Sequence, residues 1–140
     1  MTIFEFQNKV KDALNGVEAL VQGGCMAFAE DTRTVYDEAN QWISDGKVAV
    51  VVTTPRMQRN GDRAGTLPME CTLAIRCLEI APLASEDTSV IRALDAAEIV
   101  GHALDGRQLC LVSIDQTADE RTKTITATAS FNTTIHLTND

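Results

Sequence analysis

The side chains with the most obvious capacity for chemistry are Asp95, Glu98 and His102, at positions i, i+3 and i+7 of a predicted helix. Glu98 and His102 are four residues apart, so they share one face of that helix and are of types that bind a metal ion. The sequence supplies no third ligand beside them, and a hydrated polar face explains the same spacing. We therefore predict no metal site.

Four cysteines offer thiols without a catalytic or metal-binding pattern; they are Cys25, Cys71, Cys77 and Cys110. None belongs to a C-x-x-C pair, and the chain has 2 histidines that could act as further ligands or as a base. We expect the Cys110 thiol to stay protonated in an apolar strand, because no histidine is near it in the sequence. Motifs for a bound nucleotide phosphate or for a hydrolase are also missing. We predict neither catalysis nor a cofactor.

Three arginines are the remaining candidates: Arg56, Arg59 and Arg63, in a polar segment over residues 56–67. With Asp62 they give this segment a charge of +2, so the rest of a chain of net charge -8 must sum to -10. A basic segment on an acidic domain is complementary to another copy of the same chain, and such a contact builds rings when its rotation closes. A hydrated arginine-rich loop is the alternative. We predict that these arginines contact another protein subunit.

The composition indicates a single globular domain. The chain has 140 residues, 44% of them hydrophobic, which suits a single domain with a core. Its 20 acidic and 12 basic side chains give a negative field, whereas proteins that track phosphates need a basic face. No apolar run approaches the roughly 20 residues that cross a bilayer, and the N-terminus does not resemble a secretory signal. We expect one domain over residues 1–140, made inside the cell, with no affinity for membranes or for specific nucleic-acid sequences.

Apolar residues at helical spacing predict three helices, over residues 3–15, 33–44 and 87–105. Thr2 and Glu5 form a capping box for the first helix, because a hydroxyl and a carboxylate can each bind a free backbone N–H. Ser85 or Thr88 is expected to begin the third. Asx-Gly pairs follow all three helices and are typical of helix ends.

Four strands are predicted, over residues 47–54, 69–80, 107–117 and 122–137. The run V-A-V-V-V at residues 48–52 indicates a strand buried on both faces. In the last strand, apolar side chains occupy odd positions, and threonine, serine and other polar side chains occupy even ones, so one face is buried and the other is wet. Residues 25–29 are compatible with a short strand or with irregular chain.

These elements predict an α+β domain in the order α-α-β-β-α-β-β, with a mainly antiparallel four-stranded sheet and helices packed on one face. The polar segment becomes a long hairpin arm at about residues 55–68. Residues 122–137 would extend about 53 Å as a strand, whereas a domain of this size is about 37 Å across. Either a bulge bends this strand, or its end projects and offers unpaired backbone groups to another chain.

The order of elements resembles the tail terminator (tail-completion, minor tail) proteins of long-tailed bacteriophages and prophages. The likeness rests on the N-terminal amphipathic helix, the valine-rich strand, the polar hairpin arm and the threonine-rich terminal hairpin. It implies an α/β fold and a homo-oligomeric ring, typically a hexamer, that caps the tail tube, stops its growth and joins it to the head. The implied partners are further copies of the chain, a tail-tube protein and a head-completion protein. The implied location is the virion tail, after synthesis in the bacterial cytoplasm.

Two other interpretations are compatible with the sequence. Another phage connector or a tail-tube component would share the sheet and the arm but polymerise instead of closing. A small-molecule-binding or enzymatic α+β domain would need a pocket with convergent polar groups between helix and sheet. The aromatic content of 4% makes a rich ligand pocket the weaker expectation.

Overall fold

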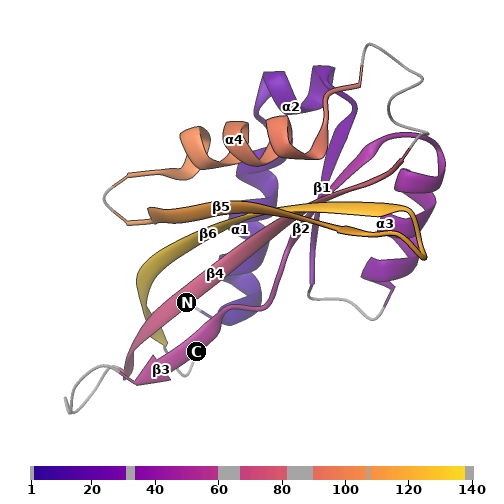
Figure 1. The fold of residues 1–140 in the computed structure, drawn as a ribbon. Helices are drawn as coiled ribbons and strands as arrows, with labels where there is room; N and C mark the ends of the chain where they lie inside the picture. Colours follow the sequence, from indigo (N-terminus) through magenta and orange to yellow (C-terminus); the bar gives the residue numbers. More distant parts are fainter. Residues whose placement is uncertain (1, 31–33, 60–66, 82–89, 107, 138–140) are drawn as a thin grey trace.

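Residues 2–30, 34–59, 67–81, 90–106 and 108–137 are described by the structure, a computed structural model (Figure 1). The elements in chain order are α1 (Ile3–Asn15), α2 (Glu18–Gln22), β1 (Cys25–Ala29), α3 (Val35–Ser44), β2 (Val48–Val52), β3 (Arg56–Arg59), β4 (Leu67–Ile80), α4 (Ala93–Leu104), β5 (Cys110–Asp119) and β6 (Thr124–Leu137). Among these residues, no helix is long and apolar enough to span a lipid bilayer.

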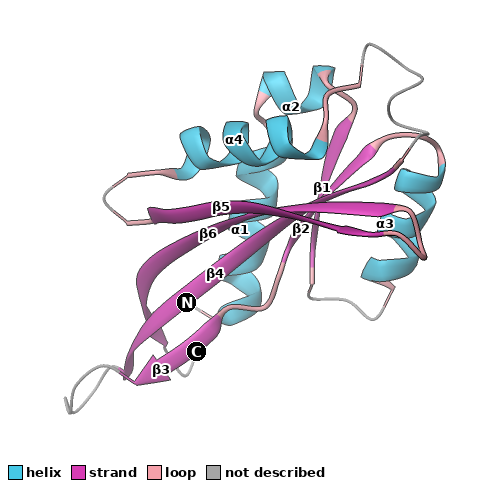
Figure 2. Cartoon of the chain, in the orientation of Figure 1, coloured by secondary structure: helices cyan, strands magenta, loops and turns pink. Residues whose placement is uncertain are grey.

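The strands form one 6-stranded sheet in the order β1-β2-β4-β6-β5, and β3 pairs with the first half of β4 (Figure 2). β1 and β2 are parallel, and every other pair is antiparallel. The prediction of a four-stranded, mainly antiparallel sheet was therefore wrong. It lacked β1, whose connection to β2 through α3 is a parallel crossover, and it treated β3 as part of a polar loop.

Helices cover both faces of the sheet, which corrects the prediction that they pack on one face. Val48, Val50 and Val52 face the core formed with α1, α2 and α4. Ala49 and Val51 point the other way and pack against Ile43 and the rest of α3. Because all five residues of β2 are buried, a helix on each side is required to exclude water from that strand.

Two of the three predicted helices are found close to their expected bounds, whereas the third begins six residues later than the predicted residue 87. α1 spans the predicted residues, and its capping box is present: the Glu5 amide donates to the Thr2 hydroxyl at 3.2 Å, and the Thr2 amide donates to the Glu5 carboxylate at 3.3 Å. α3 begins at Val35, and α4 begins at Ala93, after an N-cap at Arg92. The prediction that Ser85 or Thr88 begins this helix was therefore wrong; both residues lie outside the described ranges.

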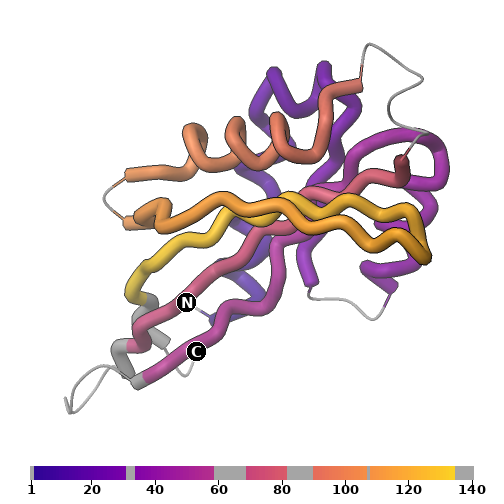
Figure 3. Tube along the Cα trace, viewed as in Figure 1, coloured from indigo at the N-terminus to yellow at the C-terminus, as the bar shows by residue number. Residues whose placement is uncertain are grey.

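The last strand, β6, fits within its own sheet although its predicted length exceeds the expected width of the domain. β6 pairs with β4 along all 14 of its residues, from Thr124 opposite Ile80 to Leu137 opposite Leu67 (Figure 3). The alternation predicted for β6 is confirmed over residues 127–131, because Ala127, Ala129 and Phe131 are buried and the residues between them are half-buried. The irregularity in register lies in β5, between Leu111 and Ser113, and not in β6. β5 ends opposite Asn132, so the end of β6 beyond that residue has a paired strand on one side only.

An ion pair between a buried carboxylate and a half-exposed guanidinium joins the start of α4 to the sheet. Glu79 on β4 is 1% exposed, and its Oε1 accepts from the Arg92 guanidinium at 2.9 Å (Nε) and 2.8 Å (a terminal nitrogen). This hydrogen bond, together with the attraction of the Glu79 carboxylate, raises the pKa of Arg92 above its ordinary value. The pair holds α4 over β4 and β6, on the side opposite α3.

Candidate assembly interface

The described residues of the predicted arm, 55–59 and 67–68, include the whole of β3 and the start of β4. β3 lies against β4 with Arg56 opposite Thr72 and Arg59 opposite Met69, and this part of β4 pairs in turn with the end of β6. In Figure 1 these parts of β3, β4 and β6 extend together beyond α4. The Arg56 side chain is exposed. Of the other two arginines, Arg59 is the last residue of β3, and Arg63 lies outside the described residues.

One face of β4, β6 and β5 carries polar side chains, and α3 covers only its end near the β5–β6 turn. We call this the polar face; its members are Thr72, Arg76, Ser113, Asp115, Thr117, Thr128, Ser130 and Asn132. Register places Arg76, Thr128 and Asp115 side by side across the three strands. Arg56 lies on the same face, because it is directly opposite Thr72. The solvent-exposed face predicted for the last strand therefore extends over the neighbouring strands β4 and β5.

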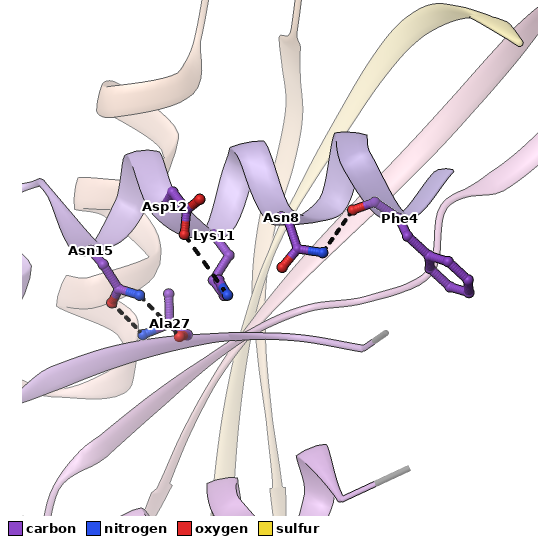
Figure 4. A network of polar contacts seen from close by, with 6 residues as sticks. All are labelled: Phe4, Asn8, Lys11, Asp12, Asn15 and Ala27. Atoms are coloured by element: carbon purple, nitrogen blue, oxygen red, sulfur yellow. Dashed lines mark hydrogen bonds and ion pairs between the residues drawn. The ribbon is translucent and has the colours of Figure 1, made fainter. Parts of the chain in front are cut away.

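One edge of the sheet is blocked by a side chain. β1 pairs with β2 alone, and Asn15 at the end of α1 lies against its open side (Figure 4). The Ala27 amide donates to the Asn15 Oδ1 at 2.9 Å, and the Asn15 Nδ2 donates to the Ala27 carbonyl at 3.2 Å. The carboxamide occupies both backbone groups as a neighbouring strand would, which prevents another chain from pairing there. The sequence indicated Asn15 only as a helix end.

We expect Asn15→Ala to lower the free energy of unfolding by about 1–3 kcal/mol, because two partly buried backbone groups lose their partner. The variant should also aggregate faster than wild type, since the edge of β1 becomes available. Asn40→Ala is the control, because Asn40 is an exposed asparagine on α3. Urea unfolding and light scattering measure both effects. Equal stability of the two variants would contradict the role given to Asn15.

The opposite edge of the sheet is open over most of its length. At the start of β5, the Leu111 amide donates to the Asp105 carboxylate at 3.0 Å. Beyond Leu111, no hydrogen bond from the described residues reaches the outer side of β5. Val112, at the irregularity, is 58% exposed. Natural sheets usually protect such an edge, so an unblocked strand of 10 residues is a candidate site for pairing with another chain.

β3 pairs with β4 alone and so forms a further edge of the sheet, and the edges at β5 and β3 carry opposite charge. β5 ends in an acidic stretch, with Asp115 and Asp119 exposed on the strand and Glu120 exposed in the turn. The Asp119 carboxylate also accepts from the Arg121 amide at 3.0 Å, so it helps to form the turn. At the other side of the sheet, Arg56 projects from β3. The basic segment could be identified from the sequence, whereas the place of these acids on a free edge depends on the order of strands in the sheet.

The candidate metal ligands do not form a site. Asp95 caps its own helix, because its carboxylate accepts from the Arg92 amide at 3.2 Å. Glu98 and His102 are exposed on α4. Within the described ranges, no group of three histidine, cysteine, aspartate or glutamate side chains could hold a metal ion.

The cysteines occupy two kinds of environment. Burial raises the pKa of Cys25 to about 12, and burial followed by repulsion from Cys25 raises the pKa of Cys77 still further. Both thiols are therefore protonated at neutral pH and serve as core side chains. Cys110 was expected in an apolar strand, but its side chain is exposed at the start of the edge strand β5.

Comparisons with known proteins find similarity in structure but not in sequence. No family model matches the chain, and no curated protein sequence matches it. Among solved structures, a chain from the "Virion of native gene transfer agent (GTA) particle" superposes with a TM-score of 0.64 at 15% identity. The alignment covers 97% of this chain and 98% of that one. The protein therefore shares its whole fold with a chain of a gene transfer agent virion.

Proposed function

We propose that the protein is a structural component of a phage or phage-like particle, and that it forms the ring of a tail terminator. The observation that carries the proposal is the likeness to a chain of a gene transfer agent virion, which covers 97% of this chain and 98% of that one. The order of elements supports the same class, because the amphipathic helix α1, the antiparallel pair β3–β4 and the threonine-rich hairpin β5–β6 follow one another in the expected order.

The surface suits a protein that works by contact with other proteins. One sheet edge is blocked by Asn15, whereas the edge at β5 is open. The arm carries Arg56 on its surface, on a chain whose net charge is -8. Such features make a subunit that is completed by its neighbours. In this proposal Arg56, Arg59 and Arg63 contact an adjacent copy or the tail tube.

The proposed role has two further partners. The ring would sit in the virion tail, where one side would cap the tail-tube protein and the other would meet a head-completion protein. Capping requires that the ring closes, because a subunit that adds indefinitely would extend the tube instead of ending it.

Electron microscopy of the purified protein at micromolar concentration tests this role. Closed rings of uniform diameter are the expected result. Tubes would instead indicate a tail-tube component, and isolated particles of one subunit at low salt would contradict a ring that forms before it meets the tail.

A further inference from the structure

We infer that the open edge of β5 binds the β3 edge of a second copy, so that the sheets of neighbouring subunits join into one. This inference rests on the proposed ring and names the surfaces that would close it. The two edges lie on opposite sides of the sheet, since β3 and β2 flank β4 on one side while β6 and β5 follow on the other. In a contact between different edges, each subunit uses its β5 edge toward one neighbour and its β3 edge toward the other, which is the arrangement that a ring requires.

Strand direction favours this pairing. β5 is antiparallel to β6, and β6 is antiparallel to β4, so β5 runs in the direction of β4. β3 is antiparallel to β4 and therefore opposite in direction to β5. A rotation about an axis close to the strand direction preserves these directions, so β3 of one copy meets β5 of the next as an antiparallel pair, which is the more stable arrangement.

The charges of the side chains favour β3, and not a second β5, as the partner of β5. Asp115 on β5 and Arg56 on β3 lie on the same face of the sheet, so in a joined sheet their side chains lie on one side of it. Opposite charges on neighbouring strands attract, and like charges repel. Pairing β5 with another β5 would bring two acidic strands together, and pairing β3 with another β3 would bring two basic strands together.

The offset along the strands between Arg56 and Asp115 matches the tilt of the strands in a closed sheet. Arg56 is level with Asn132, and Asp115 is level with Thr128, so bringing the pair together shifts one copy by four residues. That shift is about 13 Å along the strands, at about 3.3 Å per residue. Across the strands β3, β4, β6 and β5, each copy adds about 19 Å of width at about 4.8 Å per strand. The resulting tilt is about 35°, within the range of sheets that close on themselves.

Charge reversal tests the pairing. The variants are Arg56→Glu, Asp115→Arg and the double variant, with Lys9→Glu and Asp37→Arg as controls that change exposed charges on α1 and α3. Sedimentation velocity measures the concentration at which half of the protein is assembled. Each single reversal should raise this concentration by about tenfold or more, because like charges then face each other. The double variant should return to within about threefold of wild type, and both controls should match wild type.

Each outcome separates the pairing from the proposed ring. If wild type assembles and the single reversals assemble equally well, the β3–β5 pairing is overturned while the ring stands. If Asp115→Arg assembles more tightly than wild type, the surface that faces Asp115 is acidic and is not β3, and the inference is again overturned. If wild type never assembles, both are contradicted. Circular dichroism of all variants confirms that the fold is unchanged, as expected for exposed side chains.

Discussion

Replacing Phe131 with alanine should lower the free energy of unfolding by about 3–5 kcal/mol, the largest single loss expected in this domain. Phe131 is 0% exposed at the middle of β6, with Leu73 of β4 on one side and Leu111 of β5 on the other. It belongs to the core that α1 and α4 share with the sheet. Truncation leaves a cavity where strands on both sides limit relaxation, so the cost of the void adds to the lost burial.

Phe4→Ala is the matched control for this prediction. The same side chain at position 4 is 58% exposed, so its removal should change the free energy of unfolding by no more than about 0.5 kcal/mol. Urea denaturation monitored by circular dichroism gives both values from midpoint and slope. A loss below about 1 kcal/mol at Phe131 would contradict the packing described for β6.

Replacing Arg92 with alanine should cost about 2 kcal/mol, because it leaves the Glu79 carboxylate buried without its partner. The full penalty for breaking a buried pair is larger, but the Arg92 side chain is 50% exposed, so water can partly replace it. The loss should appear as earlier detachment of α4, since Arg92 is its N-cap residue.

A double-mutant cycle separates the pair from other effects of Arg92. In Arg92→Ala with Glu79→Leu, no charge remains to be buried, so much of the lost stability should return. Thermal unfolding of the wild type, the two single variants and the double variant gives the coupling. Losses that simply add would show that the two side chains do not interact as the structure indicates.

Local sequence patterns were sufficient to predict the elements that local interactions stabilise. The Thr2–Glu5 capping box and the apolar spacing behind it predicted α1 with the bounds that the structure has. The run at residues 48–52 indicated a strand buried on both faces, and all five residues are buried. That run also implied a cover on each face, which the predicted one-sided arrangement of helices did not provide.

The missed strands depend on partners that are distant in sequence. Cys25–Ala29 is a short strand whose parallel pairing with β2 needs the α3 crossover, and a five-residue pattern does not reveal it. Arg56–Arg59 is polar and has no alternation of its own; it is a strand because β4 is long enough to pair with both β2 and β3. Both errors came from assigning each segment by its own residues.

The candidate interface was predicted in part. The basic residues of the arm were identified from charge alone, and Arg56 is exposed on β3. The amide that blocks β1 and the acids on the open edge of β5 could not be identified, because an edge is defined by the order of strands and not by local sequence. Asn15 and Asp115 acquire their proposed roles only from that order.

The mass of the purified protein in solution tests the central claim most directly. We predict that native mass spectrometry at micromolar concentration and low salt finds one closed assembly, of about six copies of the 15.2 kDa chain, as in the resembled family. High salt should dissociate it, because opposite charges at the two edges contribute to the contact. A mass of 15.2 kDa at every concentration and salt would contradict a subunit that is completed by copies of itself.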